Sequence, residues 1–195
     1  MRDKYKVILV DDEIDVAERI ANKMQWEELG FEKPVICKNA LDALDVAEKI
    51  HPEVVMTDIT MPYMNGLQLS HKLKEEYPNI RIIIFSGYDE FEYAQEAVHI
   101  QAEEYILKPI DADKLKTVFT NIRNALDKEY DERQNISKLE SYYNDSLPIL
   151  QESFYASLME NKFAKDQLDH FKEIYSIDLN SPYYCAVILH VSTHT

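Results

Sequence analysis

The sequence predicts an α/β protein, a doubly wound sheet of five parallel strands followed by a C-terminal helical extension. Five short apolar runs alternate with helical patterns over residues 1–125. The runs are continuously apolar, which is typical of parallel strands covered by helices on both faces. Right-handed crossovers between such strands then favour the doubly wound arrangement.

The first two strand–helix pairs lie before Pro52. The run KVILV at 6–10 is unbroken and predicts a buried strand. Apolar residues recur on one helical face over 14–26, which predicts an amphipathic helix. A short strand at 34–37 follows, and apolar residues at helical spacing predict a second helix over 40–50 that stops before the proline.

Three further strand–helix pairs complete the pattern. Apolar runs predict the remaining strands at 54–57, 80–85 and 105–107. Helical spacing predicts the remaining helices at 67–77, at 90–99 and from Asp111 onward. Pro78 stops the first of these, and Asp111 is suited to capping the last.

Apolar residues continue at helical spacing beyond residue 125, which predicts a long helix or a pair of helices. The pattern fails at Glu129 and Glu132 and resumes at Ile136, and Pro148 is expected to interrupt it. These imperfect heptads predict a coiled coil with weak or switchable self-association. Another helix is expected at 168–175.

We divide the chain accordingly into three parts. Residues 1–125 form the α/β domain and residues 126–180 a helical linker. Residues 181–195 are expected to begin a further domain or to form a terminal strand, because the apolar run at 184–191 has nothing after it to pair with.

The charge and cysteine content exclude several classes of protein. The 21 Lys and Arg against 36 Asp and Glu give a net charge of −15, which disfavours direct binding to nucleic acid or to an anionic membrane. No apolar run has the ~18 residues of a membrane span, and the N-terminus does not resemble a signal peptide. Cys37 and Cys185 are too few for a zinc site or a disulfide framework, which indicates a reducing cytoplasm.

Polar residues follow four of the predicted strands. Asp11 and Asp12 follow the first, Asp58 the third, Ser86 the fourth and Lys108 the fifth. Ligands of doubly wound sheets bind beyond the carboxyl ends of the strands, so these side chains should converge there. Crowded aspartates need a cation, and a set of oxygen ligands favours Mg²⁺. Glu13 is assigned to the helix N-terminus instead.

Four segments resemble the receiver domain of two-component response regulators. They are VDDE (10–13), TDITMPYMNG (57–66), FSGYDEFEYAQEA (85–97) and YILKP (105–109). The resemblance covers residues 5–125 and implies the flavodoxin-like strand order 2-1-3-4-5. The chain is also similar to the N-terminal part of AraC-type regulators, which have a helix-turn-helix output. Such an output does not occur in these residues.

The resemblance implies a role for each marker residue. Asp58 is implied as the phosphoacceptor. Mg²⁺ is implied to bind Asp11, Asp12, Asp58 and the backbone carbonyl of Thr60. Ser86 and Lys108 are implied to contact the phosphoryl group, and Ser86 and Tyr105 to form the conformational switch. The Lys108–Pro109 bond is implied to be cis, in keeping with the near confinement of cis bonds to X-Pro.

The expected function is a phosphorylation-activated receiver that catalyses only its own phosphorylation and dephosphorylation. The implied partners are a sensor histidine kinase and a second copy of the chain, bound through the fourth helix, fifth strand and fifth helix or through the linker. The implied output is transcription regulation by a DNA-binding domain outside these residues.

Three alternatives stay open. One is a dimerisation module that is never phosphorylated. Another is a Mg²⁺-dependent phosphohydrolase with an aspartyl nucleophile, which generally has a second acid where this sequence has Thr60. The third is a flavodoxin-like cofactor binder, which needs a phosphate-binding loop where this sequence has Asp-Asp-Glu.

Overall fold

A computed structural model of the chain describes residues 4–87, 91–160, 162 and 165–177. The chain divides into two compact units between Tyr130 and Asp131. The predicted strand at 184–191 and the predicted further domain at 181–195 lie outside the described residues.

The first unit is built on five parallel strands in the order β2-β1-β3-β4-β5, which confirms the predicted fold class. The strands are β1 (Val7–Val10), β2 (Val35–Cys37), β3 (Val54–Asp58), β4 (Arg81–Ser86) and β5 (Glu104–Leu107). Every residue of β1 and β3 is buried, as their unbroken apolar runs predict.

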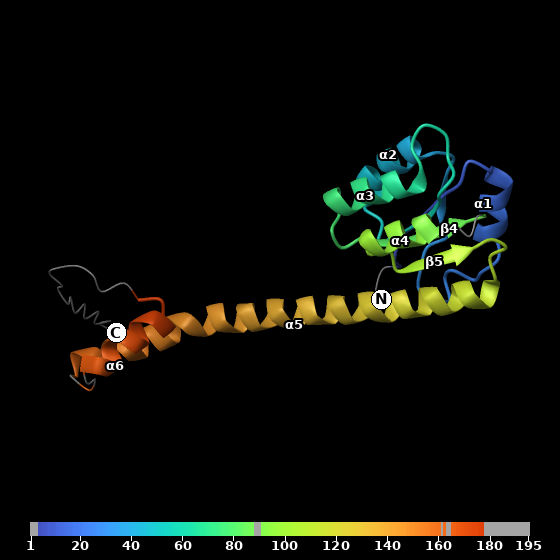
Figure 1. Ribbon diagram of the computed structural model, residues 1–195. Helices are drawn as coiled ribbons and strands as arrows, with labels where there is room; N and C mark the ends of the chain where they lie inside the picture. The colour runs from blue at the N-terminus through green and yellow to red at the C-terminus, as the bar shows by residue number, and fades with distance from the viewer. Residues whose placement is uncertain (1–3, 88–90, 161, 163–164, 178–195) are drawn as a thin grey trace. The chain divides into compact units, whose positions relative to one another are not determined.

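Helices cover both faces of the sheet (Figure 1). They are α1 (Ile14–Ala21), α2 (Ala40–Ile50), α3 (Gly66–Glu76), α4 (Phe91–His99) and α5 (Ala112–Met159). Buried side chains of α1 and the first part of α5 form one core cluster with the sheet. Those of α2, α3 and α4 form the other. The sheet is therefore covered on both faces, and a ligand can reach it only at the ends of its strands.

Helix α1 ends at Ala21, so the predicted helix over 14–26 was too long. The buried indole N–H of Trp26 donates to the Ala21 carbonyl oxygen at 2.6 Å. In a continuing helix this carbonyl would accept the N–H of Gln25. The Trp26 side chain thus takes the acceptor that the next helical turn would have used, and the helix ends at Ala21.

Helix α5 continues through Pro148 over 48 residues, so the predicted interruption was wrong. A proline in a helix removes one N–H donor and crowds the carbonyl four residues before it, which bends a helix more often than it ends one. The residues on either side of Pro148 remain helical. The boundary between the two units therefore falls inside one helix.

The second unit pairs the end of α5 with helix α6 (Lys165–Ile174), close to the predicted helix at 168–175. Phe154 of α5 is buried beside the ring of Tyr175, with ring centroids 6.0 Å apart. The side-chain amide of Gln151 donates to the Tyr175 carbonyl oxygen at 2.9 Å. These contacts hold the chain after α6 against one side of α5.

Candidate functional site

Three of the predicted site residues lie together at the carboxyl edge of the sheet. Asp11 follows β1 directly, Asp58 ends β3, and Lys108 follows β5. The parallel register pairs Val10 with Thr57, so the two aspartates come next on neighbouring strands. The sheet itself therefore brings the two carboxylates together, as expected from their positions after the strands.

The Lys108 ammonium bridges the two carboxylates. Its Nζ lies 2.7 Å from Asp58 Oδ1 and 3.1 Å from Asp11 Oδ2. The other carboxylate oxygens accept backbone N–H groups, Asp11 Oδ1 from Glu13 at 2.9 Å and Asp58 Oδ2 from Thr60 at 2.7 Å. Each of the four oxygens therefore has a donor, which fixes the orientation of both carboxylates.

Burial and charge act in opposite directions on the pKa values of the site. Burial raises the pKa of the Asp58 carboxyl, the Lys108 ammonium lowers it, and the charge of Asp11 raises it further, so the net shift is upward. Burial lowers the pKa of Lys108, but its hydrogen bonds and attraction to both carboxylates outweigh this, so that pKa is raised overall. Lys108 therefore stays a cation.

The backbone around Asp58 is tightly packed. A Cβ atom on Gly66 would lie 2.0 Å from the Asp58 carbonyl oxygen and 2.8 Å from Thr57 Oγ1. The Gly66 N–H donates to the Ile59 carbonyl oxygen at 2.9 Å, which closes the loop after β3. Helix α3 begins there with a capping box between Asn65 and Gln68. Glycine at this position thus permits the close approach behind Asp58.

The structure places the remaining predicted residues around this centre. Ser86 ends β4 and is buried, and its carbonyl oxygen accepts the Lys108 N–H at 2.8 Å. Tyr105 is half-buried on β5, and Asp12 is exposed beside Asp11. The Lys108–Pro109 peptide bond is cis, the isomer that the resemblance implies.

Three supporting contacts were not predicted from the sequence. The Glu13 backbone N–H orients Asp11, Gly66 makes room behind Asp58, and the Phe85 ring lies beneath Lys108, with Nζ 5.0 Å from its centroid. The scarcity of glycine, three in the chain, was a usable signal for Gly66. Neither of the other two contacts has a signature in residue type or spacing.

The carboxylate oxygens of this site supply some, but not all, of the ligands that a hard cation needs. Mg²⁺ is commonly held by one or two carboxylates together with waters and phosphate oxygens, and Asp11 and Asp58 offer two buried carboxylates side by side. Among the described residues, no three His, Cys, Asp or Glu side chains are grouped to hold a metal by themselves. The site therefore fits an ion that keeps non-protein ligands.

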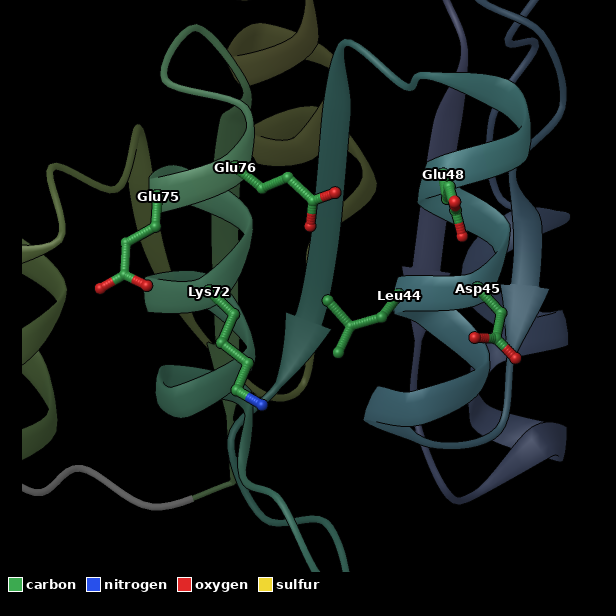
Figure 2. Close-up of a pocket in the computed structure, with 6 residues that line it drawn as sticks. All are labelled: Leu44, Asp45, Glu48, Lys72, Glu75 and Glu76. Atoms are coloured by element: carbon green, nitrogen blue, oxygen red, sulfur yellow. The ribbon is translucent and has the colours of Figure 1, made fainter.

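A separate hollow of about 480 Å³ lies between α2 and α3. Its lining is mostly acidic and consists of Leu44, Asp45, Glu48, Lys72, Glu75 and Glu76. Figure 2 shows Leu44 and Glu76 pointing into the space between the two helices. None of the strand-end residues lines this hollow, so it is distinct from the site formed by Asp11, Asp58 and Lys108.

Comparison with known proteins agrees with this geometry. The chain is 30% identical over 179 residues to a response regulatory protein of Staphylococcus epidermidis. The matched region covers 91% of the chain and 69% of the relative. It is 27% identical to the transcriptional regulatory protein HptR of Staphylococcus aureus, over 88% of the chain and 64% of HptR. The chain thus spans about two thirds of these relatives.

Solved structures match the first unit. The REC domain of AraT, a response regulator from Geobacillus stearothermophilus, is 36% identical with a TM-score of 0.61, over 65% of this chain and 98% of that one. A two component transcriptional regulator AraC from Clostridium phytofermentans is 26% identical with a TM-score of 0.59, over 66% and 99%.

The match to a protein family covers more than half of the chain. Residues 7–120 match the response regulator receiver domain, a span that begins at β1 and ends within α5. It includes the strand-end residues Asp11, Asp58, Ser86 and Lys108. The chain belongs to the response regulator receiver domain family, whose members are the signal-receiving parts of two-component systems.

Proposed function

We propose that this chain receives a phosphoryl group on Asp58 and passes the signal to an output outside the first unit. The observation that carries the proposal is the buried Asp58 carboxylate, 2.7 Å from the Lys108 ammonium and beside the carboxylate of Asp11. A carboxylate can form an acyl phosphate, and a fixed cation stabilises the charge that develops during transfer.

In the proposed reaction, an Asp58 carboxylate oxygen attacks the phosphorus of a phosphohistidine on a sensor histidine kinase. The O–P bond forms as the N–P bond breaks, and the histidine keeps the bonding electron pair. Lys108 then neutralises a phosphoryl oxygen, which requires it to exchange its contact with Asp58 for one with the new group. The Ser86 hydroxyl is proposed to bind a second phosphoryl oxygen, and Tyr105 to report the change.

Mg²⁺ belongs to this proposal as the cofactor. Asp11, Asp12, Asp58 and the Thr60 carbonyl would hold it, and the ion supplies further neutralisation of phosphoryl charge when bound. The two buried carboxylates support this assignment because they already face one cation, Lys108. Asp12 follows Asp11 directly in the chain and is exposed.

We further propose that the protein is not an enzyme toward other substrates. An aspartyl phosphohydrolase generally carries a second acid two residues after its nucleophile, to serve as acid and base, and that position is Thr60 here. The Thr60 backbone N–H instead donates to Asp58 Oδ2. This residue supplies no proton-transfer group for turnover, so the acyl phosphate should persist long enough to act as a signal.

The proposed output is transcription regulation by a DNA-binding domain outside these residues. The similarity to HptR and to an AraC regulator supports it. Since the chain covers 64% of HptR, the remaining third of such a relative is where an output would lie. A cytoplasmic location goes with this proposal. In the described residues, no helix has the length and apolar character needed to cross a bilayer.

The test is intact mass after incubation with Mg²⁺ and a small acyl phosphate. Wild type should gain one phosphoryl group, and Asp58→Asn should gain none. Asp45→Asn, which removes an acid from the hollow between α2 and α3, should label like wild type. Labelling of Asp58→Asn would overturn the site, and no labelling of wild type would favour the dimerisation module. Steady release of phosphate from an ester would favour the phosphohydrolase.

A further inference from the structure

The middle of α5 buries little surface against the part of the chain that the structure describes. Every described residue from 131 to 146 is exposed. Helices in water obtain most of their stability from packing an apolar face, and isolated helices are marginal even with favourable sequences. This stretch therefore needs a partner surface to be a stable helix.

One face of this helix is free of charge between residues 135 and 153. At 100° per residue, nine side chains fall within an arc of about 140°. They are Asn135, Ile136, Leu139, Tyr142, Tyr143, Ser146, Ile149, Leu150 and Ser153, which we call the α5 strip. Leu139, Tyr142 and Ile149 are 67%, 70% and 69% exposed. The charged residues of the same stretch all lie outside the arc.

The strip is continuous and borders the surface that already packs in the second unit, with Tyr143 common to both. Phe154 and Gln151 face the chain after α6, and the Tyr143 hydroxyl donates to the Ile174 carbonyl oxygen at 2.9 Å. Pro148 lies about 170° from the centre of the strip. The missing N–H of the proline thus leaves the strip intact.

We propose that the α5 strip binds the same strip of a second copy, in a parallel coiled coil. Its members at 136, 139, 143, 146, 150 and 153 follow the alternating three- and four-residue spacing of a two-stranded seam. Ile136 and Leu139 are a β-branched residue and a leucine at successive seam positions, the combination that favours parallel dimers. Two serines further along the seam let the helices approach closely.

The charge distribution favours a copy of this chain over a different partner. An uncharged strip has no complementary charge by which to select another protein, whereas a two-fold axis lets it pair with itself. One heptad before Leu139, Glu132 would face its own copy, and this repulsion ends the pairing toward the receiver. The inference is independent of the phosphoryl chemistry at Asp58.

Light scattering tests the pairing. Wild type should have twice the 22.9 kDa of one chain at micromolar concentration, and Leu139→Glu should have the mass of one chain. Ser141→Glu adds the same charge on the opposite face and should leave the dimer intact. Circular dichroism at high concentration checks that the receiver remains folded in both. A monomeric wild type, or a Leu139→Glu protein that stays dimeric, would overturn the proposal.

Cysteine cross-linking tests the orientation. With Cys37→Ala and Cys185→Ser as background, Ser153→Cys should form an intermolecular disulfide under mild oxidation, because parallel helices bring equal positions together. Ser141→Cys on the far face is the control and should cross-link far more slowly. An antiparallel pair centred on the strip would separate the two copies of residue 153. Equal rates for the two variants would therefore refute the parallel arrangement.

Discussion

The Lys108 side chain is 22% exposed and lies between two carboxylates that are at most 7% exposed. Without this cation, both acids would stay buried and lose the opposite charge that lies beside them. Breaking one side of a buried ion pair is more destabilising than replacing the whole pair. The buried carboxylates that suit the site for phosphoryl transfer would therefore destabilise the protein if Lys108 were removed.

Lys108→Met should lower the free energy of unfolding by about 1–3 kcal/mol in metal-free buffer at neutral pH, a range reduced to allow for the partial exposure of Lys108. The cause is the mutual repulsion and desolvation of Asp11 and Asp58. Urea unfolding measures the loss. The same substitution in an Asp58→Asn background should cost less, since only Asp11 then remains charged. Equal losses in both backgrounds would show that the two carboxylates are not coupled through Lys108.

Gly66→Ala should destabilise the first unit by about 1–3 kcal/mol, the usual cost of overpacking. The new methyl group would meet the Asp58 carbonyl oxygen at 2.0 Å, and backbone cannot give way as a flexible side chain can. Phosphoryl acceptance should slow as well, because Asp58 must shift. Gly87→Ala is the control, since among the described residues no atom outside its two chain neighbours lies within 4 Å of its added Cβ. Similar urea midpoints for the two variants would contradict this account.

Cys37 should resist alkylation in the folded protein. Burial raises the pKa of its thiol to about 11, with a further contribution from the charge of Asp42. At pH 8 this reduces the reactive thiolate about a hundredfold relative to a thiol of pKa 9. A Cys185→Ser protein isolates Cys37, and mass spectrometry after iodoacetamide should show labelling only in denaturant. Rapid labelling of the native protein at pH 8 would contradict the buried position.

The first part of α5 is held on the sheet by two sets of polar contacts. Arg81 of β4 pairs with Glu129 of α5 and, at 2.6 Å, with Glu103. Tyr5, which precedes β1, donates its hydroxyl to Asp127 of α5 at 2.8 Å, and Asp127 also pairs with Arg123 of the same helix. These contacts lie within the two helical turns before the boundary of the first unit. They therefore determine where α5 leaves the receiver.

Arg81→Gln should loosen this end of α5 locally. With Glu103 and Glu129 unpaired, we expect a loss of about 1 kcal/mol, or roughly fivefold faster amide exchange across residues 123–130. Hydrogen exchange with mass spectrometry measures it. Lys114→Gln is the matched control, since the Lys114–Glu104 pair is more exposed and should contribute little. Unchanged exchange in Arg81→Gln would show that apolar packing alone holds the helix.

Element order was predictable because each strand is an apolar run and each helix has one apolar face. Asp11, Asp58 and Lys108 were predictable as neighbours because parallel strands end at one edge. Helix ends were less so, since the end of α1 depends on a long-range constraint, the buried Trp26. The Arg81 contacts also join residues far apart in the sequence, which local patterns do not encode. The continuation through Pro148 was missed for another reason, since a proline bends a helix more often than it ends one.

The whole chain consists of a receiver and a helical unit that share one helix. The boundary between compact units follows Tyr130, five residues beyond the boundary expected from sequence. The five intervening residues include Leu126, which is buried in the receiver core, and Asp127 and Glu129, which make the polar contacts of α5. We therefore assign residues 126–130 to the receiver as a folding unit.

A chain truncated after Tyr130 should unfold cooperatively and accept phosphate like the full chain, because it keeps both core clusters. Truncation after residue 125 should cost about 2–4 kcal/mol more, since it removes a buried leucine and two ion-paired acids. Urea unfolding of the two truncated chains, side by side, gives the difference directly. If they unfold at the same urea concentration, residues 126–130 contribute nothing to the receiver, and α5 leaves it one turn earlier than its contacts indicate.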